Sequence, residues 1–251
     1  GDMFYIKHNG QNFTIIDCSL SGENKKEIVA EIKKESSDKE IVRFISTHPD
    51  RDHFHGLKYL DEQIKILNFY CVKNKTIKKD ECAHFNHYCL LRDSEKVFHI
   101  EKGCKRKWMN DDSPERQHSG IHVLWPIVNN EYYKEALAMA ESGESPNNIS
   151  PIIQYSLDNG ATILWMGDLE TEFMEKIKDI IELPKVEILF APHHGRDTGK
   201  IPEDWLKKMD PKIIVIGEAL KYLKKTLSSG FELAIKSDIP IGSGMGSSAA
   251  V

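Results

Sequence analysis

The 251-residue sequence lacks an apolar run long enough to span a bilayer, and no signal peptide is recognisable at its start. It also lacks a disulfide framework, because its five cysteines are an odd number without regular spacing; this predicts reduced thiols and a cytoplasmic protein. No basic excess exists, since 34 lysines and arginines face 39 acidic residues and the net charge is −5. We therefore expect no membrane contact and no overall basic surface. The 40% hydrophobic content predicts one compact body with a sizeable core.

What the sequence does have is a dense group of ionisable side chains in residues 47–56, which read THPDRDHFHG. Imidazoles and carboxylates are the usual protein ligands of hydrolytic Zn, Mn or Fe ions. The group follows an apolar, β-branched stretch at residues 40–46 and precedes a helical pattern at residues 57–65. Its side chains would therefore lie at the carboxyl end of a strand. The alternative is a solvated polar loop whose histidines are incidental.

Two later strands end in the same kinds of residue. The buried pattern at residues 161–166 is followed by Gly167 and Asp168, and the pattern at residues 186–191 is followed by Pro192, His193, His194 and Gly195. Three strand ends that carry His and Asp groups, separated by long stretches of chain, are typical of a metal site assembled by the fold.

Together these motifs resemble the metallo-β-lactamase superfamily, whose signature is His-x-His-x-Asp-His followed by a strand-end Asp and a strand-end His. The sequence is most similar to the branch typified by the lactamase-like domain of competence DNA-uptake proteins, which has Asp at the second His, as at Asp50, and ends in His-His-Gly. Residues 1–17 look like that branch's first hairpin, with Asn9-Gly10 as its turn. The resemblance implies a mixed α/β fold, the four-layer αββα metallo-β-lactamase sandwich, over residues 1–217.

The resemblance also implies a set of metal ligands for two divalent ions. One ion would be held by His48 and Asp50, the other by Asp52, His53 and His194, with Asp168 bridging the two. Zinc is the first expectation for the site that contains His53 and His194. At the His48/Asp50 site the added carboxylate favours Mn or Mg.

Four neighbouring residues receive other roles. Asp52 and His193 are the candidates for catalysis, because His193 falls where the family usually has glycine and would be free to bind a phosphate oxygen or to protonate a leaving group. A plain packing role for His193 remains equally open. Asp17 is expected to orient the ligand loop by hydrogen bonds. His55 is expected to face outward or to cap a helix.

One ligand that the superfamily usually has is missing. Its members carry a histidine in a Pro-Gly-His turn after a central strand, but here Pro126 is followed by Ile127 and Val128. His118 and His122 would need an altered path to serve. The first site is therefore short of a protein ligand, which leaves water, an asparagine from residues 147–148, or partial occupancy to make up the difference.

These features predict a hydrolase that uses a metal-bound hydroxide and needs no Ser or Cys nucleophile. The basic segments at residues 73–79 and 102–107, together with the competence-domain resemblance, favour a phosphodiester substrate, either a small molecule or a nucleic acid. A solvated loop surface is the alternative reading of both segments. A degenerate, non-catalytic domain that binds a metal or a nucleotide is the second hypothesis, because the central histidine is lacking.

A second group of ligand-type residues comprises Cys82, His84, His87 and Cys89. A structural zinc is one hypothesis for it. Because the spacing matches no familiar zinc module, the favoured alternative is an irregular insertion packed by Phe85, Tyr88 and Leu90.

The tail, residues 218–251, departs from the superfamily. Its run IPIGSGMGSSAA resembles the phosphate-binding loop of galactokinase and mevalonate kinase, Pro-x-Gly-x-Gly-Leu-Gly-Ser-Ser-Ala, with Met245 in place of Leu. Such loops present backbone N–H groups to phosphates. A fragment of a second domain, a junction, or a coincidence would each explain the tail, and a kinase fragment is the third functional hypothesis.

Along the rest of the chain, hydrophobic periodicity and turn residues predict an alternation of strands and helices. We expect a hairpin at 3–17 and a second one at 151–157 and 161–166 across Asp158-Asn159-Gly160, strands at 40–46, 121–125, 186–191 and 212–216, and helices at 25–34, 57–65, 131–141, 170–182 and 202–209.

Overall fold

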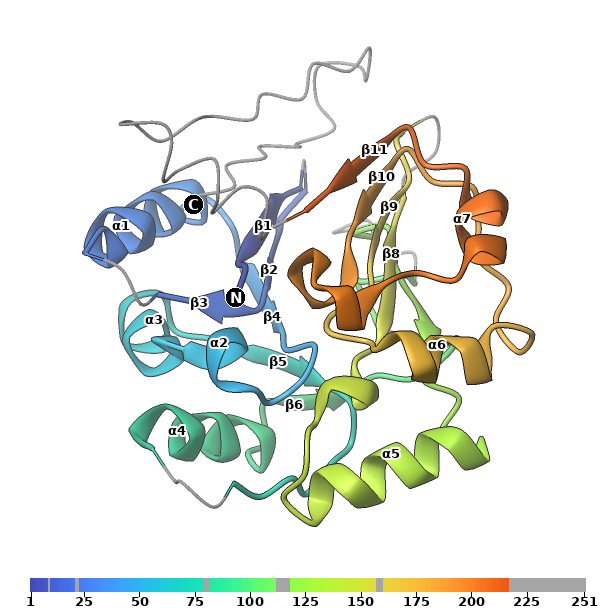
Figure 1. Cartoon of the computed structure of the whole chain (residues 1–251). Helices are drawn as coiled ribbons and strands as arrows, with labels where there is room; N and C mark the ends of the chain where they lie inside the picture. Colours follow the sequence, from blue (N-terminus) through green and yellow to red (C-terminus); the bar gives the residue numbers. More distant parts are fainter. Residues whose placement is uncertain (9, 21–22, 79–81, 112–117, 157–159, 217–251) are drawn as a thin grey trace.

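The computed structural model describes residues 1–8, 10–20, 23–78, 82–111, 118–156 and 160–216 (Figure 1). Two five-stranded sheets make up its centre. The first has the order β1-β2-β4-β5-β6 and consists of Phe4–Lys7, Asn12–Ile16, Ile41–Ile45, Asn68–Cys71 and Val97–His99. The second has the order β11-β10-β9-β8-β7 and consists of Ile213–Val215, Ile188–Phe190, Ile163–Trp165, Ile152–Tyr155 and Ile121–Trp125.

Strand direction differs between the edges and the interiors of the sheets. In the first sheet β1 is antiparallel to β2, and the remaining neighbours are parallel. In the second sheet β9, β10 and β11 are parallel, whereas β7 and β8 form antiparallel pairs. The carboxyl ends of parallel neighbours meet at one sheet edge, so β2 and β4 end together, and so do β9 and β10.

Successive side chains of a strand point to opposite faces of the sheet, so the two faces of each strand contribute to different clusters of buried residues. In β2 and β4, Ile15 is paired with Phe44 and Ile16 with Ile45. The first pair packs under the helices, and the second faces the other sheet. All four side chains are buried, and the layer between the two sheets also contains large residues of the second sheet such as Trp165, whose ring lies 6.0 Å from that of Phe4 in β1.

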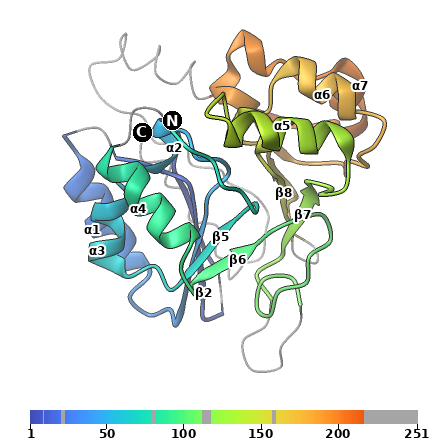
Figure 2. The ribbon, with the colours of Figure 1, turned by 90° about the horizontal axis from the view of Figure 1, so that it is seen from below.

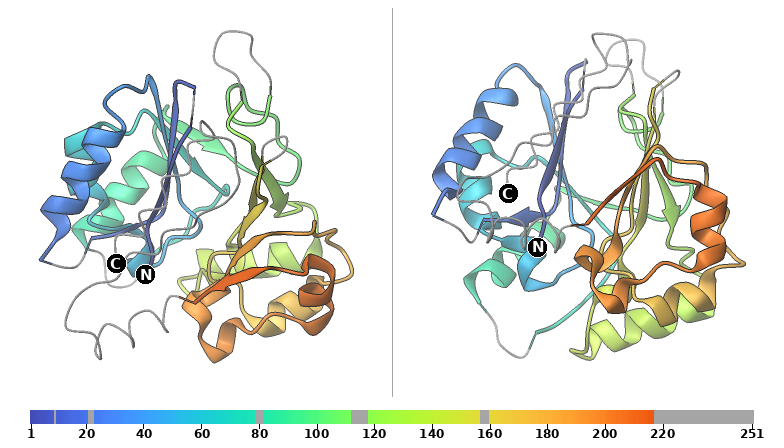
Figure 3. Two further views of the ribbon diagram at one scale, coloured as in Figure 1. Left: turned by 90° about the horizontal axis from the view of Figure 1, so that it is seen from above. Right: turned by 45° about the horizontal axis from the view of Figure 1, so that its top comes forward.

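Helices cover the outer faces of both sheets. On the first sheet lie α1 (Lys25–Glu35), α3 (Leu57–Ile64) and α4 (Ala83–Arg92), whereas α5 (Glu131–Glu141), α6 (Thr171–Ile177) and α7 (Glu203–Met209) cover the second (Figure 2). In Figure 3 the blue to teal helices α1, α3 and α4 lie on the opposite flank from α5, α6 and α7, which run from yellow-green to orange. The order helix, sheet, sheet, helix confirms the mixed α/β sandwich expected from the sequence.

Several short elements connect the longer strands and helices. A two-residue strand β3 (Cys18–Ser19) forms bridges beside the single-turn helix α2 (Arg51–Phe54). Three 3-10 turns occupy Asn147–Ile149, Pro192–Gly195 and Asp197–Gly199. Of the helices in the described part of the chain, none combines the length and apolar character needed to cross a membrane.

The segment expected to be an irregular insertion is instead an ordered helix, α4. Phe85, Tyr88 and Leu91 recur at intervals of three residues, which is a helical period, and all three side chains are buried against the first sheet. The prediction that Leu90 packs there is wrong, because its side chain is 63% exposed on the opposite face of the helix. The expected helix at 170–182 is also shorter, ending as α6 at Ile177.

Two predicted turns and the tail include residues that the structure does not describe. Asn9, Asp158 and Asn159 lie outside the described residues, although the strands on both sides of each turn pair as expected. Residues 217–251 also lie outside them, so the expected boundary at residue 217 stays a prediction.

Candidate metal centre

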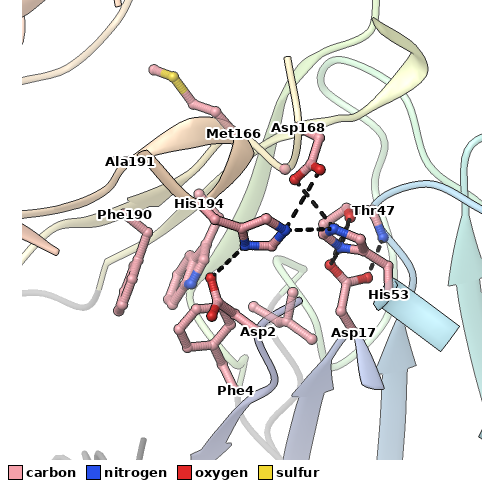
Figure 4. Close-up of a pocket in the computed structure, with 13 residues that line it drawn as sticks. Asp2, Phe4, Asp17, Thr47, His53, Met166, Asp168, Phe190, Ala191 and His194 are labelled. Carbon is pink, nitrogen blue, oxygen red and sulfur yellow. Dashed lines mark hydrogen bonds and ion pairs between the residues drawn. The ribbon is translucent and has the colours of Figure 1, made fainter. Parts of the chain in front are cut away.

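The three strand ends singled out by the sequence converge at one place between the two sheets (Figure 4). The loop after β4 and the short helix α2 supply His48, Asp52 and His53, the end of β9 supplies Asp168, and the turn after β10 supplies His194. Within the described residues, two groups could hold a metal ion: His48, His53 and Asp168, and Asp52, His53 and His194. In each group the candidate ligand atoms all lie within 4.8 Å of one another.

Unusual local backbone brings the last two ligands into place. Gly167 and His194 have positive φ angles of 53° and 58°, a region that L residues rarely occupy. At Gly167 a Cβ would lie only 2.6 Å from the hydroxyl oxygen of Ser150, and that hydroxyl accepts a 3.1 Å hydrogen bond from the Asp168 backbone N–H. Glycine therefore allows the close approach that directs Asp168 into the site.

The distances among the donors fit a tetrahedral ion. His53 Nε2 lies 3.2 Å from both His194 Nε2 and Asp168 Oδ1. Asp52 Oδ2 lies 3.3 Å from His194 Nε2, and Asp168 Oδ2 lies 3.6 Å from that nitrogen. Zinc bonds of about 2.0–2.1 Å in a tetrahedron place the ligand atoms about 3.3 Å apart. These four distances are therefore close to those between ligands of a tetrahedral zinc ion.

His48 provides an independent sign that a partner belongs here. Its Nε2 is buried and has no hydrogen-bond partner, and it lies 3.8 Å from Asp168 Oδ2. Buried polar atoms in proteins are nearly always paired. An unpaired His48 Nε2 close to the Asp168 carboxylate is what a metal-binding site without its ion would show, so these residues fit a metal ion.

The two candidate groups share one nitrogen of one residue. His53 belongs to both, and its Nδ1 is engaged by Asp17 Oδ2 at 2.8 Å, which leaves Nε2 for an ion. The two groups therefore cannot both use His53 at the same time, and they mark two adjacent positions for an ion.

Carboxylates behind the imidazoles fix their orientation. Asp17, at the end of β2, accepts hydrogen bonds from the Thr47 backbone N–H at 2.8 Å and the Thr47 hydroxyl at 2.6 Å, besides contacting His53. Asp2 lies 2.8 Å from Nδ1 of His194 in the same way. Because a carboxylate accepts hydrogen bonds, each Nδ1 is the donor and each Nε2 faces the ion position.

The carboxylates shift the pKa values of the imidazoles that they contact. Burial lowers the pKa of His53, but the charges and hydrogen bonds of Asp17 and Asp168 outweigh it and hold that pKa well above its usual value. Burial also lowers the pKa of His194, but the hydrogen bonds to Asp2 and Asp52 outweigh it, so that this pKa is raised. In His48, burial and the charge of His53 prevail and lower the pKa to about 4.

The same attraction keeps the acids ionised. Burial raises the pKa of Asp168, yet the charge of His48 and the hydrogen bond to His53 overcome this, so the pKa lies below its usual value. At Asp52 burial is again outweighed, chiefly by His194 and His53, and the pKa falls far below the ordinary range. The donor set therefore carries the negative charge that a divalent cation requires.

Asp50 lies apart from both candidate groups. Its carboxylate accepts a hydrogen bond from the Arg51 backbone N–H at 2.8 Å at the start of α2, and it forms an ion pair with Lys78. The pairing of His48 with Asp50 on one ion therefore stays a prediction, and the structure brings Asp50 to a lysine instead.

His193 and His55 belong to neither candidate group. His193 is buried next to the site, with Nδ1 2.8 Å from the Thr198 hydroxyl and Nε2 3.8 Å from Asp168 Oδ2, but it belongs to neither group. The His55 ring lies 4.5 Å from the ring of His84 on α4, away from the ion position.

The remaining alternatives for ligands are two asparagines and two histidines. The amide groups of Asn147 and Asn148 donate to Glu170 at 3.0 and 3.1 Å. His122 lies on β7, and neither it nor His118 is in a candidate group.

The four residues suggested for a structural zinc do not form a candidate group within the described residues either. His87 pairs instead with Asp61 of α3 at 2.9 Å. A helix spaces His84 and His87 along one face, and each ring already has a neighbour on another element.

Sequence reasoning missed Asp2 and Ser150, and it assigned Lys78 to a basic segment without its pairing to Asp50. Asp2 lies 192 positions from the His194 that it contacts, and Lys78 lies 28 positions from Asp50. No local pattern marks such pairs, because each is created by the packing of separate elements.

Comparisons with known proteins found one family model and several solved structures. The family model for the GHMP kinases N terminal domain matches residues 214–251, in agreement with the resemblance of the tail to the phosphate-binding loop of such kinases. No curated protein matches the chain.

Two of the solved structures to which the chain is similar are metallo-beta-lactamases. One, from Cronobacter sakazakii and described by its HARLDQ motif, is 13% identical with a TM-score of 0.42 and covers 87% of this chain and 85% of its own. The other, solved in a complex with mercaptoacetic acid, is 12% identical with a TM-score of 0.40 and covers 75% of this chain and 78% of its own. At these scores neither likeness adds to the fold that the two sheets and their helices define by themselves.

Proposed function

We propose that this chain is a metal-dependent hydrolase that holds a divalent ion among His53, His194, Asp52 and Asp168. The observation that carries the proposal is the set of distances of 3.2 to 3.6 Å that link these four side chains from three separate segments. Two imidazoles and two carboxylates suit zinc, which is the ion that we propose.

When bound, a divalent ion supplies Lewis acidity, which would polarise a substrate oxygen and lower the pKa of water, so that a hydroxide nucleophile is available near neutral pH. The chain supplies the rest. Asp17 and Asp2 hold the Nδ1 protons of His53 and His194, so that both rings stay aligned. The Asp52 side chain is 37% exposed, and its carboxylate is therefore the one placed to accept a proton from an attacking water.

For the substrate we propose a phosphodiester or a related anionic ester. Two cationic side chains that contact sequence neighbours of the proposed ligands support this choice. Lys78 forms an ion pair with Asp50, and Arg196 lies with Nη1 3.4 Å from His193 Nε2. Since a guanidinium can only donate, His193 accepts from Arg196 and holds it close to where an anionic oxygen would bind.

Metal analysis combined with a rate assay tests the proposal. The purified chain, saturated with Zn²⁺ and freed of excess, should contain bound metal and should hydrolyse bis(4-nitrophenyl) phosphate. Asp168→Asn and His53→Gln should lose both properties, whereas His122→Gln, whose ring lies outside both candidate groups, should keep both. Metal and activity that survive the first two substitutions would reject the site.

A metal-bound chain without hydrolytic activity on any ester would instead favour the non-catalytic binding domain. A kinase-type activity is a separate candidate, favoured by the family match over residues 214–251. ATP-dependent phosphorylation of a small alcohol, unaffected by Asp168→Asn, would support it.

A further inference from the structure

The family resemblance assigns Asp50 to a metal ion, but in the structure its carboxylate pairs with Lys78. Its carboxylate caps α2 through the Arg51 backbone N–H at 2.8 Å, and the same oxygen receives the Lys78 ammonium. Lys78 comes from the segment between β5 and α4, so the pair is made by tertiary packing rather than by helical spacing.

A second ion next to the first would find few free donors. His48 Nε2 has no hydrogen-bond partner, and Asp168 Oδ2 lies 3.8 Å from it, but Asp168 also serves the first ion position. The chain has Ile127 and Val128 where the missing histidine would stand. With Asp50 held by Lys78, His48 is the one donor in the two candidate groups that the first ion position does not also use, and a stable divalent site needs more.

We propose that Lys78 takes the place of a second cation, so that the site binds one divalent ion and the ammonium group both neutralises Asp50 and binds an anionic oxygen of the substrate. This inference rests on the proposed function. An ammonium group has three N–H donors and Asp50 occupies one of them. The Lys78 side chain is 23% exposed and that of Asp50 is 38% exposed, so the remaining donors are open to a ligand from solvent.

Lysine differs from a metal ion in what it can do at this position. It carries one positive charge on a flexible stem, and it binds anionic oxygens without demanding a fixed ligand geometry. It therefore contributes to substrate binding and charge neutralisation, while Lewis acidity would come from the single ion.

Metal stoichiometry gives a test that does not depend on activity. The whole chain is saturated with Zn²⁺, freed of loose ions, and assayed by inductively coupled plasma mass spectrometry. We expect one zinc per chain for the wild type and two for Lys78→Met, because the freed Asp50 can join His48 and Asp168. The double variant Lys78→Met with Asp50→Asn should return to one.

A matched control is available on the same segment. Lys75 pairs with Asp93 at 2.8 Å, and neither residue is in a candidate metal group. Lys75→Met should therefore leave the count at one and should not change binding of phosphate.

Inhibition by inorganic phosphate tests the second half of the proposal. Lys78→Met should raise the inhibition constant of phosphate about tenfold, the change that follows from losing about 1.4 kcal/mol of binding. Lys78→Arg should restore most of it, because a guanidinium still pairs with Asp50 and still donates to an anion. Thermal unfolding of each variant verifies that it is folded.

The outcomes separate this inference from the proposed function. A wild type that binds no metal would reject both. Two zinc ions in the wild type, or one in folded Lys78→Met, would overturn the role of Lys78 while leaving the metal site intact. Unchanged inhibition by phosphate in Lys78→Met would overturn its role in binding the substrate.

Discussion

His53 Nδ1 lies 2.8 Å from Asp17 Oδ2, and this contact determines which nitrogen of the ring faces the ion position. Asp17 is itself held by both the backbone N–H and the hydroxyl of Thr47. The carboxylate can therefore only accept the proton on Nδ1, and the lone pair of the neutral ring is on Nε2.

Asp17→Asn should weaken zinc binding about tenfold to hundredfold without unfolding the protein. The asparagine amide would offer an N–H to Nδ1 and so move the ring proton to Nε2, the nitrogen needed for the ion. Competition with a zinc chelator measures the affinity. Asp61→Asn is the matched control, since Asp61 pairs with His87 outside the site. Equal affinities in the two variants would contradict the role of Asp17.

Asp2→Asn should have the same kind of effect through His194, whose Nδ1 lies 2.8 Å from Asp2 Oδ2. We expect a loss of about tenfold in zinc affinity, at the lower end of the range for such contacts, because the Asp2 side chain is 34% exposed and water can replace part of the interaction. The same chelator competition measures it. Full affinity in this variant would show that the hydrogen bond is dispensable.

Gly167→Ala should destabilise the fold by about 1–3 kcal/mol, the usual range for a strained backbone position. The new Cβ would meet Ser150 Oγ at 2.6 Å and Thr47 Cβ at 3.1 Å, and it would displace Asp168. Gly103→Ala is the control, because Gly103 also has a positive φ but nothing lies within 4 Å of its Cβ position. Urea denaturation should show a clearly larger loss at Gly167, with zinc affinity reduced in that variant alone.

Removal of the metal should lower the unfolding temperature. An ion that binds the folded chain at a free concentration of about 100 times its dissociation constant stabilises it by about 2.7 kcal/mol. EDTA should therefore shift the thermal transition of the wild type downward, and Asp168→Ala should be insensitive to EDTA. A wild type whose transition EDTA leaves unchanged would speak against a tightly held ion.

Acid should destabilise the protein in part through His8, far from the ligands. Burial, together with the nearby charges of Arg43 and Lys39, lowers the pKa of His8 to about 3, whereas the unfolded chain has its ordinary value near 6.5. Between these values the unfolded state binds the extra proton, so stability falls as pH falls. The contribution amounts to about 2 kcal/mol between pH 7 and pH 5.

His8→Gln should remove that part of the pH dependence. The glutamine can still hydrogen-bond Thr14, whose hydroxyl lies 3.0 Å from His8 Nε2, but it does not titrate. Urea denaturation at pH 7 and pH 5, carried out on wild type and variant, gives the comparison. Identical losses of stability in the two proteins would show that His8 is not involved.

Much of the fold was predictable because period-two and helical patterns are local. The strands at residues 40–46 and 121–125 appear as β4 and β7 within one residue, and the helix at residues 131–141 appears as α5 with the same limits. The helix α4 was not predicted, although Phe85, Tyr88 and Leu91 carry its period. The segment was expected to be an irregular insertion, with a structural zinc as the other hypothesis, and in the structure His87 pairs with Asp61.

The sequence alone determined which residues stand at the ends of β4, β9 and β10, because strand periodicity and the following polar residues are written along the chain. Only the tertiary structure decided how each donor is used: Asp50 is held by Lys78, and His194 is oriented by Asp2. The physical reason is that a nitrogen or an oxygen becomes available to an ion only after its other hydrogen bonds are assigned, and those partners come from elements far away in the sequence.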